Sequence, residues 1–332
     1  MRFKIRIWEG LEGKLDMGSN RTVSIEKSWA IWSDCLRGND ENSVFRQISV
    51  MIWDAAIFRF VLESRQTQIE KKPDDPPLNV SFQSFLDRNY FQAQAAFIRR
   101  LADKSRYGLI GKKSIYSLYS LIDDISKRRT ELTRETFFRL RQIPYDYSKL
   151  QQAEKEFIAQ QLGENRSEFK IPPEFDWEVS ADAHTTFDRL CSVQAQNRKP
   201  QDIISEKVFS RLKNRLDLCS DITNYVDKYV AHSATPESRT LENVDSVKIT
   251  LKHIWDAHKI IYEVAEFLSL ILFSEGHVPL AWKSPTLFDN WEAPLLESED
   301  INRLELVYKE YGEETTKWQL EDVNNLWEWI ES

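Results

Sequence analysis

The chain has 332 residues, of which 41% are hydrophobic and 30% charged, a balance typical of a globular protein with one large or two ordinary domains. Only 9 glycines and 11 prolines are present. This disfavours β-sandwich and α/β folds, which need many turn residues, and predicts an all-α protein. The formal net charge of −8 excludes a surface that attracts nucleic acid everywhere, but leaves room for a local basic face.

Helical periodicity, with apolar residues repeating every three and four positions, runs through the first half of the chain. Residues 1–20 are expected to be irregular, and a proline-rich loop is expected over 67–80. Ser81 is a suitable N-cap for the helix that follows this loop. The predicted helices are 41–66, 81–104, 114–129 and 133–141.

The second half of the chain continues the helical pattern, and its most regular stretch is 244–273, a predicted helix of about thirty residues with one apolar stripe. A loop containing proline and tryptophan is expected over 275–297. The other predicted helices are 148–162, 180–195, 202–230, 299–311 and 318–331. We therefore divide the chain into an N-terminal helical extension and linker (1–80), a helical bundle (81–275) and an acidic, Trp-rich C-terminal segment (276–332).

Cysteine usage and hydropathy bear on the location of the protein. The cysteines are scattered and form no C-x-x-C pair: Cys35, Cys191 and Cys219. This argues against a disulfide framework and a thiolate zinc site. The most apolar stretch, Val264 to Phe273, is too short to span a membrane and contains Glu266. The basic first residues are followed by acidic ones from Glu9 onward, unlike a signal peptide. We expect a cytoplasmic protein with no membrane segment.

The charge is unevenly distributed along the chain. Residues 99–141 hold 12 Lys/Arg against 5 Asp/Glu, a balance of +7, whereas residues 289–332 hold 3 against 13, a balance of −10. Two solvated helical surfaces explain this pattern, and so does a basic face for a polyanion with an acidic tail that covers it or binds a partner. On the second interpretation the RNA-binding residues are Arg99, Arg100, Lys112, Lys113, Arg128 and Arg129.

The usual catalytic and metal-binding signatures are absent from the sequence. The chain has no G-x-S-x-G elbow and no H-E-x-x-H motif, and the glycines of Gly108-Leu-Ile-Gly-Lys-Lys-Ser are too close together for a P-loop. His253 and His258 lie about 140° apart on a helix, so they would not share a metal ion easily. His258 falls on the apolar stripe and is predicted to be a hydrogen-bonded core histidine. We expect no metal and no cofactor.

One segment carries a family resemblance. It reads Asn224-Tyr-Val-Asp-Lys-Tyr-Val-Ala-His-Ser, ending at Ser233, at the end of one long predicted helix and shortly before another. Together with Tyr90-Phe through Leu101-Ala-Asp-Lys-Ser and the later Leu121-Ile-Asp-Asp-Ile, it resembles the abortive-infection (AbiU-type) branch of the HEPN superfamily, over roughly residues 81–275. The resemblance implies a HEPN-like helical bundle, here with additional N- and C-terminal helical segments, and a homodimer.

Active members of this superfamily are metal-independent endoribonucleases with an Arg, a following polar residue and a His four to six residues after the Arg. A guanidinium binds the scissile phosphate bidentately, and an imidazole exchanges a proton near neutral pH. Here Asp227 matches the polar residue and His232 the His, so Val226 occupies the Arg slot and cannot bind phosphate. On an ideal helix, Asn224, Lys228 and His232 would share one face and form a modified site, in which Lys228 is a point charge.

Three functions stay open on the sequence. The first is a HEPN-like protein of a phage-defence or toxin–antitoxin system that has a degenerate ribonuclease motif and acts by binding and dimerisation. The second is an active metal-independent ribonuclease toxin that uses His232 with Lys228, beside Asn224 and Asp227. The third is a structural helical adaptor unrelated to the superfamily. RNA or tRNA and a cognate antitoxin or defence protein are the expected partners.

Overall fold

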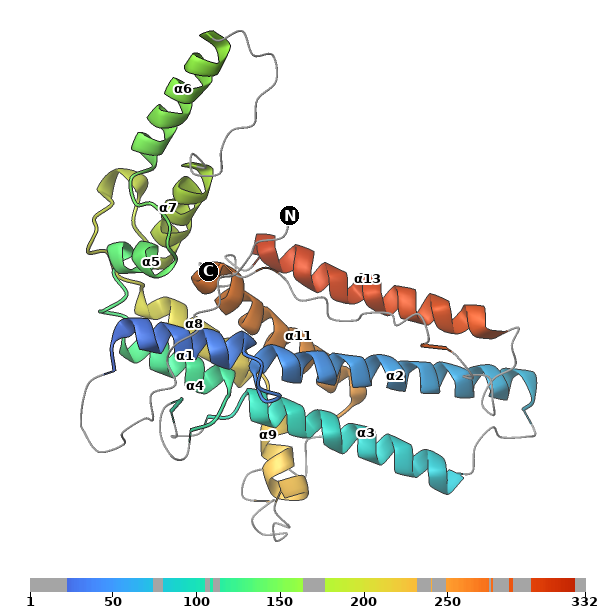
Figure 1. The fold of residues 1–332 in the computed structure, drawn as a ribbon. Coiled ribbons are helices and arrows are strands. Elements are labelled where there is room, and N and C mark those ends of the chain that lie inside the picture. Colours follow the sequence, from blue (N-terminus) through green and yellow to red (C-terminus); the bar gives the residue numbers. More distant parts are fainter. Residues whose placement is uncertain are drawn as a thin grey trace.

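The computed structural model describes residues 23–73, 80–104, 108–109, 114–163, 177–231, 240, 249–274, 276, 287–288 and 300–325. Helices dominate these residues and no strand occurs among them apart from one isolated bridge between Thr133 and Ile203, so the all-α prediction is confirmed (Figure 1). No helix in the described part of the chain is long and apolar enough to cross a bilayer.

The elements, in chain order, are α1 (Ile25–Arg37), α2 (Val44–Lys71), α3 (Val80–Leu101), α4 (Leu118–Lys127), α5 (Arg134–Leu140), α6 (Tyr147–Gly163), α7 (Trp177–Cys191), the 3-10 turn η2 (Ala195–Asn197), α8 (Glu206–Asp217), α9 (Ser220–Tyr225), the π-helix η3 (Val226–Ala231), α11 (Leu251–Phe267), the π-helix η5 (Leu268–Phe273) and α13 (Ile301–Asn325).

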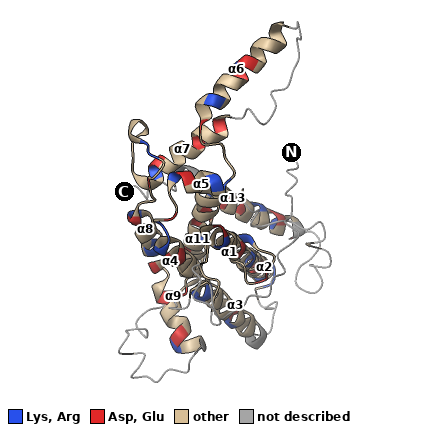
Figure 2. Cartoon of the chain, turned by 60° about the vertical axis from the view of Figure 1, so that its left-hand side comes forward, with Lys and Arg blue, Asp and Glu red and all other residues tan. Residues whose placement is uncertain are grey.

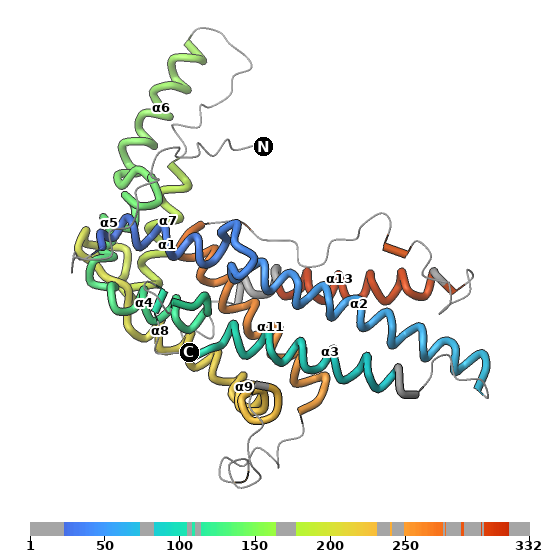
Figure 3. Tube along the Cα trace, turned by 60° about the horizontal axis from the view of Figure 1, so that its bottom comes forward, coloured from blue at the N-terminus to red at the C-terminus, as the bar shows by residue number. Residues whose placement is uncertain are grey.

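Helix α11 is the centre of the bundle. Every side chain from Ile260 to Phe267 is buried, because α2, α3, α8 and α13 pack around the helix (Figures 1 and 3). The apolar stripe of the sequence lies on the side of α11 that these helices cover, and from Ile260 onward burial extends around the whole helix, Glu263 and Glu266 included. Since α2 and α13 both pack on α11, segments from the two ends of the chain complete one core.

A second group of helices, α5, α6 and α7, projects from one end of the bundle (Figures 1 and 2). Helix α6 packs on α7. Ser180 Oγ donates to the carbonyl of Pro144, and Trp177 Nε1 donates to Glu154 Oε2, both over 2.6–2.8 Å. These bonds hold α7 against α6 and the turn before it.

Several helix ends differ from the sequence prediction. Ser81 is not an N-cap, because α3 already begins at Val80. Helix α4 begins later than predicted, after Ser117, whose hydroxyl accepts from Ser120 N. The predicted helix 244–273 begins only at Leu251, where Thr250 and His253 form a reciprocal capping box. Its residues 244–248 and the irregular segment 1–20 lie outside the described residues.

Two predictions about helix continuity were wrong. The helix predicted over 202–230 is interrupted at Leu218 and Cys219, which lets α8 pack on α4 and α11 while α9 packs on α3. The two short C-terminal helices are one helix, α13, because Tyr311, Thr315 and Trp318 are all buried at helical spacing against the bundle. Helix α1, capped by Ser24, was not predicted.

Candidate functional site

The segment that resembles the HEPN motif lies on α9 and η3, which pack against α3 (Figure 3). Val226, in the expected Arg slot, is 3% exposed and belongs to the core. Asp227 and Lys228 are partly exposed and Asn224 is exposed. His232 and Ser233 lie outside the described residues. The slot that would present a cation to RNA is therefore filled by an apolar side chain that points into the protein.

A guanidinium reaches this segment from another helix. Arg99, near the end of α3, donates from Nε to Asp227 Oδ1 over 2.9 Å and from Nη1 to Asp103 Oδ2 over 2.7 Å. The two carboxylates together outweigh its single positive charge. The structure thus joins one predicted RNA-binding residue, Arg99, to one predicted catalytic residue, Asp227.

The segment is not one continuous α-helix. Asn224 lies on α9 and Lys228 on the π-helix η3, so the ideal α-helical face that the sequence predicted spans two kinds of helix. Aromatic contacts fix this segment: Tyr225 packs edge-on against Phe91 of α3 and stacks on Tyr229.

Beside Arg99 lies a pocket of about 480 Å³. It forms where the start of α2, the end of α3 and the residues just before α4 meet. Arg99 and Arg100 lie on one side, Asp40 and Gln47 are contributed by the α1–α2 connection and α2, and Tyr116 by the segment before α4. Pockets of this size are typical of small-ligand sites. No sequence motif marked it, since its residues come from separate stretches of the chain.

The predicted RNA-binding residues do not form one cluster. Arg100 is exposed and lies 4.6 Å over the ring of Phe97. Arg128 is held bidentately by Glu131, and it also contacts α1. Arg129 contacts Ile204 O and Glu206 Oε2 over 3.5 Å. The ten-residue helix α4, about 15 Å long, separates these two arginines from the α3 end. Lys112 and Lys113 lie outside the described residues. Figure 2 shows basic and acidic residues interspersed along the helices.

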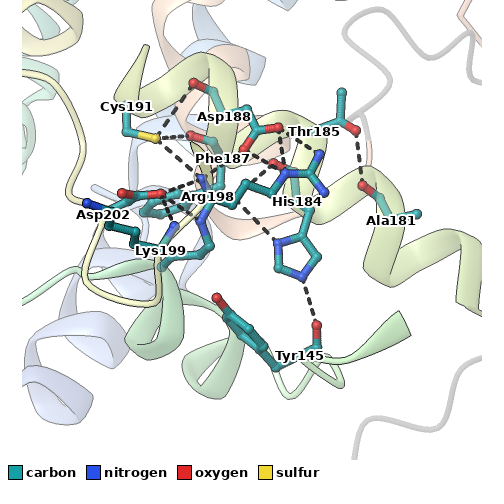
Figure 4. A network of polar contacts seen from close by, with 11 residues as sticks. Tyr145, Ala181, His184, Thr185, Phe187, Asp188, Cys191, Arg198, Lys199 and Asp202 are labelled. Carbon is teal, nitrogen blue, oxygen red and sulfur yellow. Dashed lines mark hydrogen bonds and ion pairs between the residues drawn. The ribbon is translucent and has the colours of Figure 1, made fainter. Parts of the chain in front are cut away.

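A buried polar network between α5, α7 and the residues before α8 was missed by the sequence analysis (Figure 4). Arg134 is fully buried, and its Nη2 lies 2.8 Å from Asp188 Oδ1 and 2.9 Å from Asp202 Oδ2. Arg198 donates to both oxygens of Asp188. Every charge in this network is compensated by an opposite charge. We therefore interpret the network as structural, holding α5 against α7.

Two titratable groups in this network are held in their neutral forms. The His184 ring lies between Tyr145 O, 2.7 Å from Nε2, and Arg134 Nη1, 3.4 Å from Nδ1. Burial lowers the pKa of His184 and raises the pKa of Cys191. A neutral imidazole and a protonated thiol that are already bound to backbone and arginine partners are poorly suited to nucleophilic chemistry.

Two further titratable groups lie in the core around α11. His258 is fully buried, as predicted, but the prediction of hydrogen bonds was wrong, because neither ring nitrogen has a partner among the described residues. Burial and Arg59 lower its pKa to about 3. Glu266 accepts from Tyr262 Oη over 2.8 Å, and burial raises its pKa to about 8. Both groups are therefore uncharged near neutral pH.

Among the described residues, no group of three or more His, Cys, Asp or Glu side chains is placed to hold a metal ion. Comparisons with protein-family models, with curated proteins and with solved structures give no match to this chain. The function proposed below therefore depends on the residues, on the resemblance that they carry and on their geometry.

Proposed function

We propose that this chain is a HEPN-like protein of a phage-defence or toxin–antitoxin system that binds RNA, dimerises and carries a degenerate ribonuclease motif. The observation that carries the proposal is the burial of Val226, which is 3% exposed in the motif's Arg slot. A ribonuclease of this type needs a guanidinium at the scissile phosphate. The guanidinium of Arg99, the nearest substitute, is already bound by Asp103 and Asp227.

The packing supports the family part of this proposal. Helices α3 and α4 pack against α8, α9, η3 and α11, so the stretches that carry the resemblance lie in one helical bundle. The stretch from α8 to η3 also exposes apolar side chains, with Leu218 62% and Tyr229 41% exposed. Exposed apolar groups of this kind are suited to an interface with a second copy. A cognate antitoxin or defence protein belongs to the same proposal.

A second candidate is an active metal-independent endoribonuclease in a cytoplasmic toxin. The observation that favours it is the position of Arg99 Nε, 2.9 Å from Asp227 Oδ1. A guanidinium supplied from α3 could take the place of the missing Arg if RNA phosphate displaced one of the two carboxylates. His232 and Lys228 would then serve proton transfer and charge stabilisation.

The test is incubation of the purified protein with total RNA and tRNA in EDTA, with binding followed in parallel by fluorescence anisotropy at increasing salt. The variants are His232→Ala, Lys228→Ala and Arg99→Gln, with Arg88→Gln on the same helix as the matched control. We expect salt-sensitive binding and intact RNA. Cleavage that His232→Ala or Arg99→Gln abolishes would overturn the degenerate motif and establish the second candidate. If the protein neither binds nor cleaves RNA, both candidates are overturned and a structural adaptor is favoured.

A further inference from the structure

The pocket beside Arg99 contains a buried polar group that lacks a partner. Gln47, in the first turn of α2, is 5% exposed, and its Nε2 donates to Asn42 O over 2.6 Å. Gln47 lines the pocket, and its buried Oε1 accepts no hydrogen bond from any described residue. An unsatisfied buried acceptor costs stability unless a donor from elsewhere fills it. The pocket is therefore built to receive an N–H or O–H group.

A second acceptor lies at the rim of the pocket. The backbone N–H of Asn42 donates to Asp40 Oδ1 over 2.7 Å, which orients the Asp40 carboxylate beside the loop that Gln47 also binds. Asp40 and Gln47 thus flank Asn42 and both line the pocket. Two neighbouring acceptors suit a ligand edge that carries two neighbouring donors.

A cation and an aromatic ring complete the lining. Arg100 forms no ion pair with any described residue, and its guanidinium carbon lies 4.6 Å over the centre of the Phe97 ring. Arg99, by contrast, is occupied by Asp103 and Asp227. Tyr116 is partly buried against the core and lines the pocket with its ring. An arginine for phosphate and a tyrosine for a base are the elements of single-stranded nucleic-acid sites.

We infer that this pocket binds one unpaired guanine nucleotide of RNA, with the phosphate on Arg100, the base on Tyr116 and the guanine N1–H and N2–H donors directed to Asp40 and Gln47 Oε1. Guanine presents two adjacent donors on its Watson–Crick edge, whereas uracil presents one N–H between two carbonyl oxygens. The inference rests on the proposed RNA-binding function and adds to it a base preference. A free guanine nucleotide has the same chemistry, so the experiment separates the two sources.

The test uses the full chain and fluorescently labelled oligouridylates that carry a single central G, A, C or U. We expect the G-containing oligomer to bind roughly tenfold more tightly than oligouridylate. Gln47→Met, which keeps the side-chain size and removes the acceptor, should reduce the affinity for the G-containing oligomer to that for oligouridylate. Arg100→Gln should weaken all oligomers and reduce the salt slope by about one, while Arg88→Gln on the same helix should do neither.

Each outcome bears on a different statement. RNA binding without any base preference, or a preference that survives both Gln47→Met and Asp40→Asn, would overturn the pocket and leave the proposed RNA-binding function standing. No RNA binding at all would overturn that function. Binding of GMP with the same dependence on Gln47, but without binding of the G-containing oligomer, would overturn RNA as the source of the nucleotide. Circular dichroism of each variant establishes that its fold is intact.

Discussion

Arg99 Nε lies 2.9 Å from Asp227 Oδ1, although the two residues are 128 positions apart in the chain. The contact joins the end of α3 to the first turn of η3, so it ties the basic stretch of the sequence to the segment with the family resemblance. Arg99 also binds Asp103, one turn further along the chain. The guanidinium that a ribonuclease motif would use is consequently shared between two carboxylates.

The energetic coupling between Arg99 and Asp227 should be small. Their side chains are 36% and 42% exposed, so solvent and salt screen the pair. A double-mutant cycle with Arg99→Gln and Asp227→Asn, measured by urea unfolding, should give about 0.2–1 kcal/mol, decreasing with added salt. A coupling that is much larger and insensitive to salt would show that the pair is buried in the species in solution, as in a dimer.

Replacing Glu266 with Gln should stabilise the protein at alkaline pH. Burial raises the pKa of Glu266 from 4.5 to about 8, so the folded state retains a proton that the unfolded chain releases. The stability from the protonated form is complete below about 4.5 and is lost as the pH rises through about 8. Thermal unfolding of Glu266→Gln and wild type should therefore coincide near pH 4 and diverge in favour of Gln up to about pH 8–9.

Glu263→Gln is the matched control for this prediction. Glu263 is also buried, but Arg215 Nε donates to its Oε2 over 3.0 Å. Removing its charge replaces a buried ion pair with Arg215 by a neutral contact, so Glu263→Gln should destabilise the protein at neutral pH. Stabilisation by both variants would contradict the assignment of different charge states to these two glutamates.

His258 should make the protein sensitive to acid. The pKa of His258 is lowered from 6.5 to about 3, so the unfolded chain binds a proton in this interval and the folded protein does not. Stability should fall with decreasing pH in that window, by up to about 1.4 kcal/mol per pH unit from this residue. His258→Leu should make the free energy of unfolding less dependent on pH in this acid range. At pH 7 the substitution should lower that free energy only slightly, because neither ring nitrogen is hydrogen-bonded to a described residue.

His184→Leu provides the comparison for His258→Leu. His184 makes a 2.7 Å hydrogen bond to Tyr145 O, which the leucine would leave without a donor. This variant should lose about 1–3 kcal/mol at pH 7. Urea unfolding of the two variants from pH 4 to 8 separates the effects, and equal losses at neutral pH would contradict the unpartnered state of His258.

Arg134 should be among the most important residues for stability. Its side chain is 0% exposed, and those of its partners Asp188 and Asp202 are 11% exposed. Arg134→Met therefore removes a positive charge from two carboxylates that water can barely reach. We expect a loss of about 3–5 kcal/mol in urea unfolding. The control Arg139→Gln removes an ion pair to Glu26 in which both side chains are more than half exposed, and it should change stability by less than about 1 kcal/mol. Similar losses in both variants would show that burial does not set the cost.

Local sequence signals predicted those elements that local chemistry controls. Helix α5 lies within the predicted helix 133–141, and Thr133 caps it. The periodic apolar residues predicted α2, although this helix continues beyond the predicted end at 66 to Lys71. Helix α6 was found within one residue of each predicted end. Helix α1 was missed although Ser24 caps it.

The candidate site could be predicted only in part. The sequence identified Asp227, Lys228 and the apolar residue in the Arg slot, because they are adjacent in the chain. It did not pair Arg99 with Asp227, and it assumed α-helical spacing where η3 is a π-helix. The pocket beside Arg99 was missed entirely, since Gln47 and Arg100 belong to different helices and neither has a motif around it.

By itself the sequence determined that the chain is helical and where most of its helices lie, because turn-residue content, periodicity and caps act over a few residues. Only the tertiary structure decided that the helix breaks at Leu218, that α13 is continuous through Gly312 and that Val226 is buried. Each of these depends on which neighbour a side chain meets: α9 turns onto α3, and Tyr311 and Trp318 pack into the core. Such contacts join residues far apart in the chain, and no local pattern contains them.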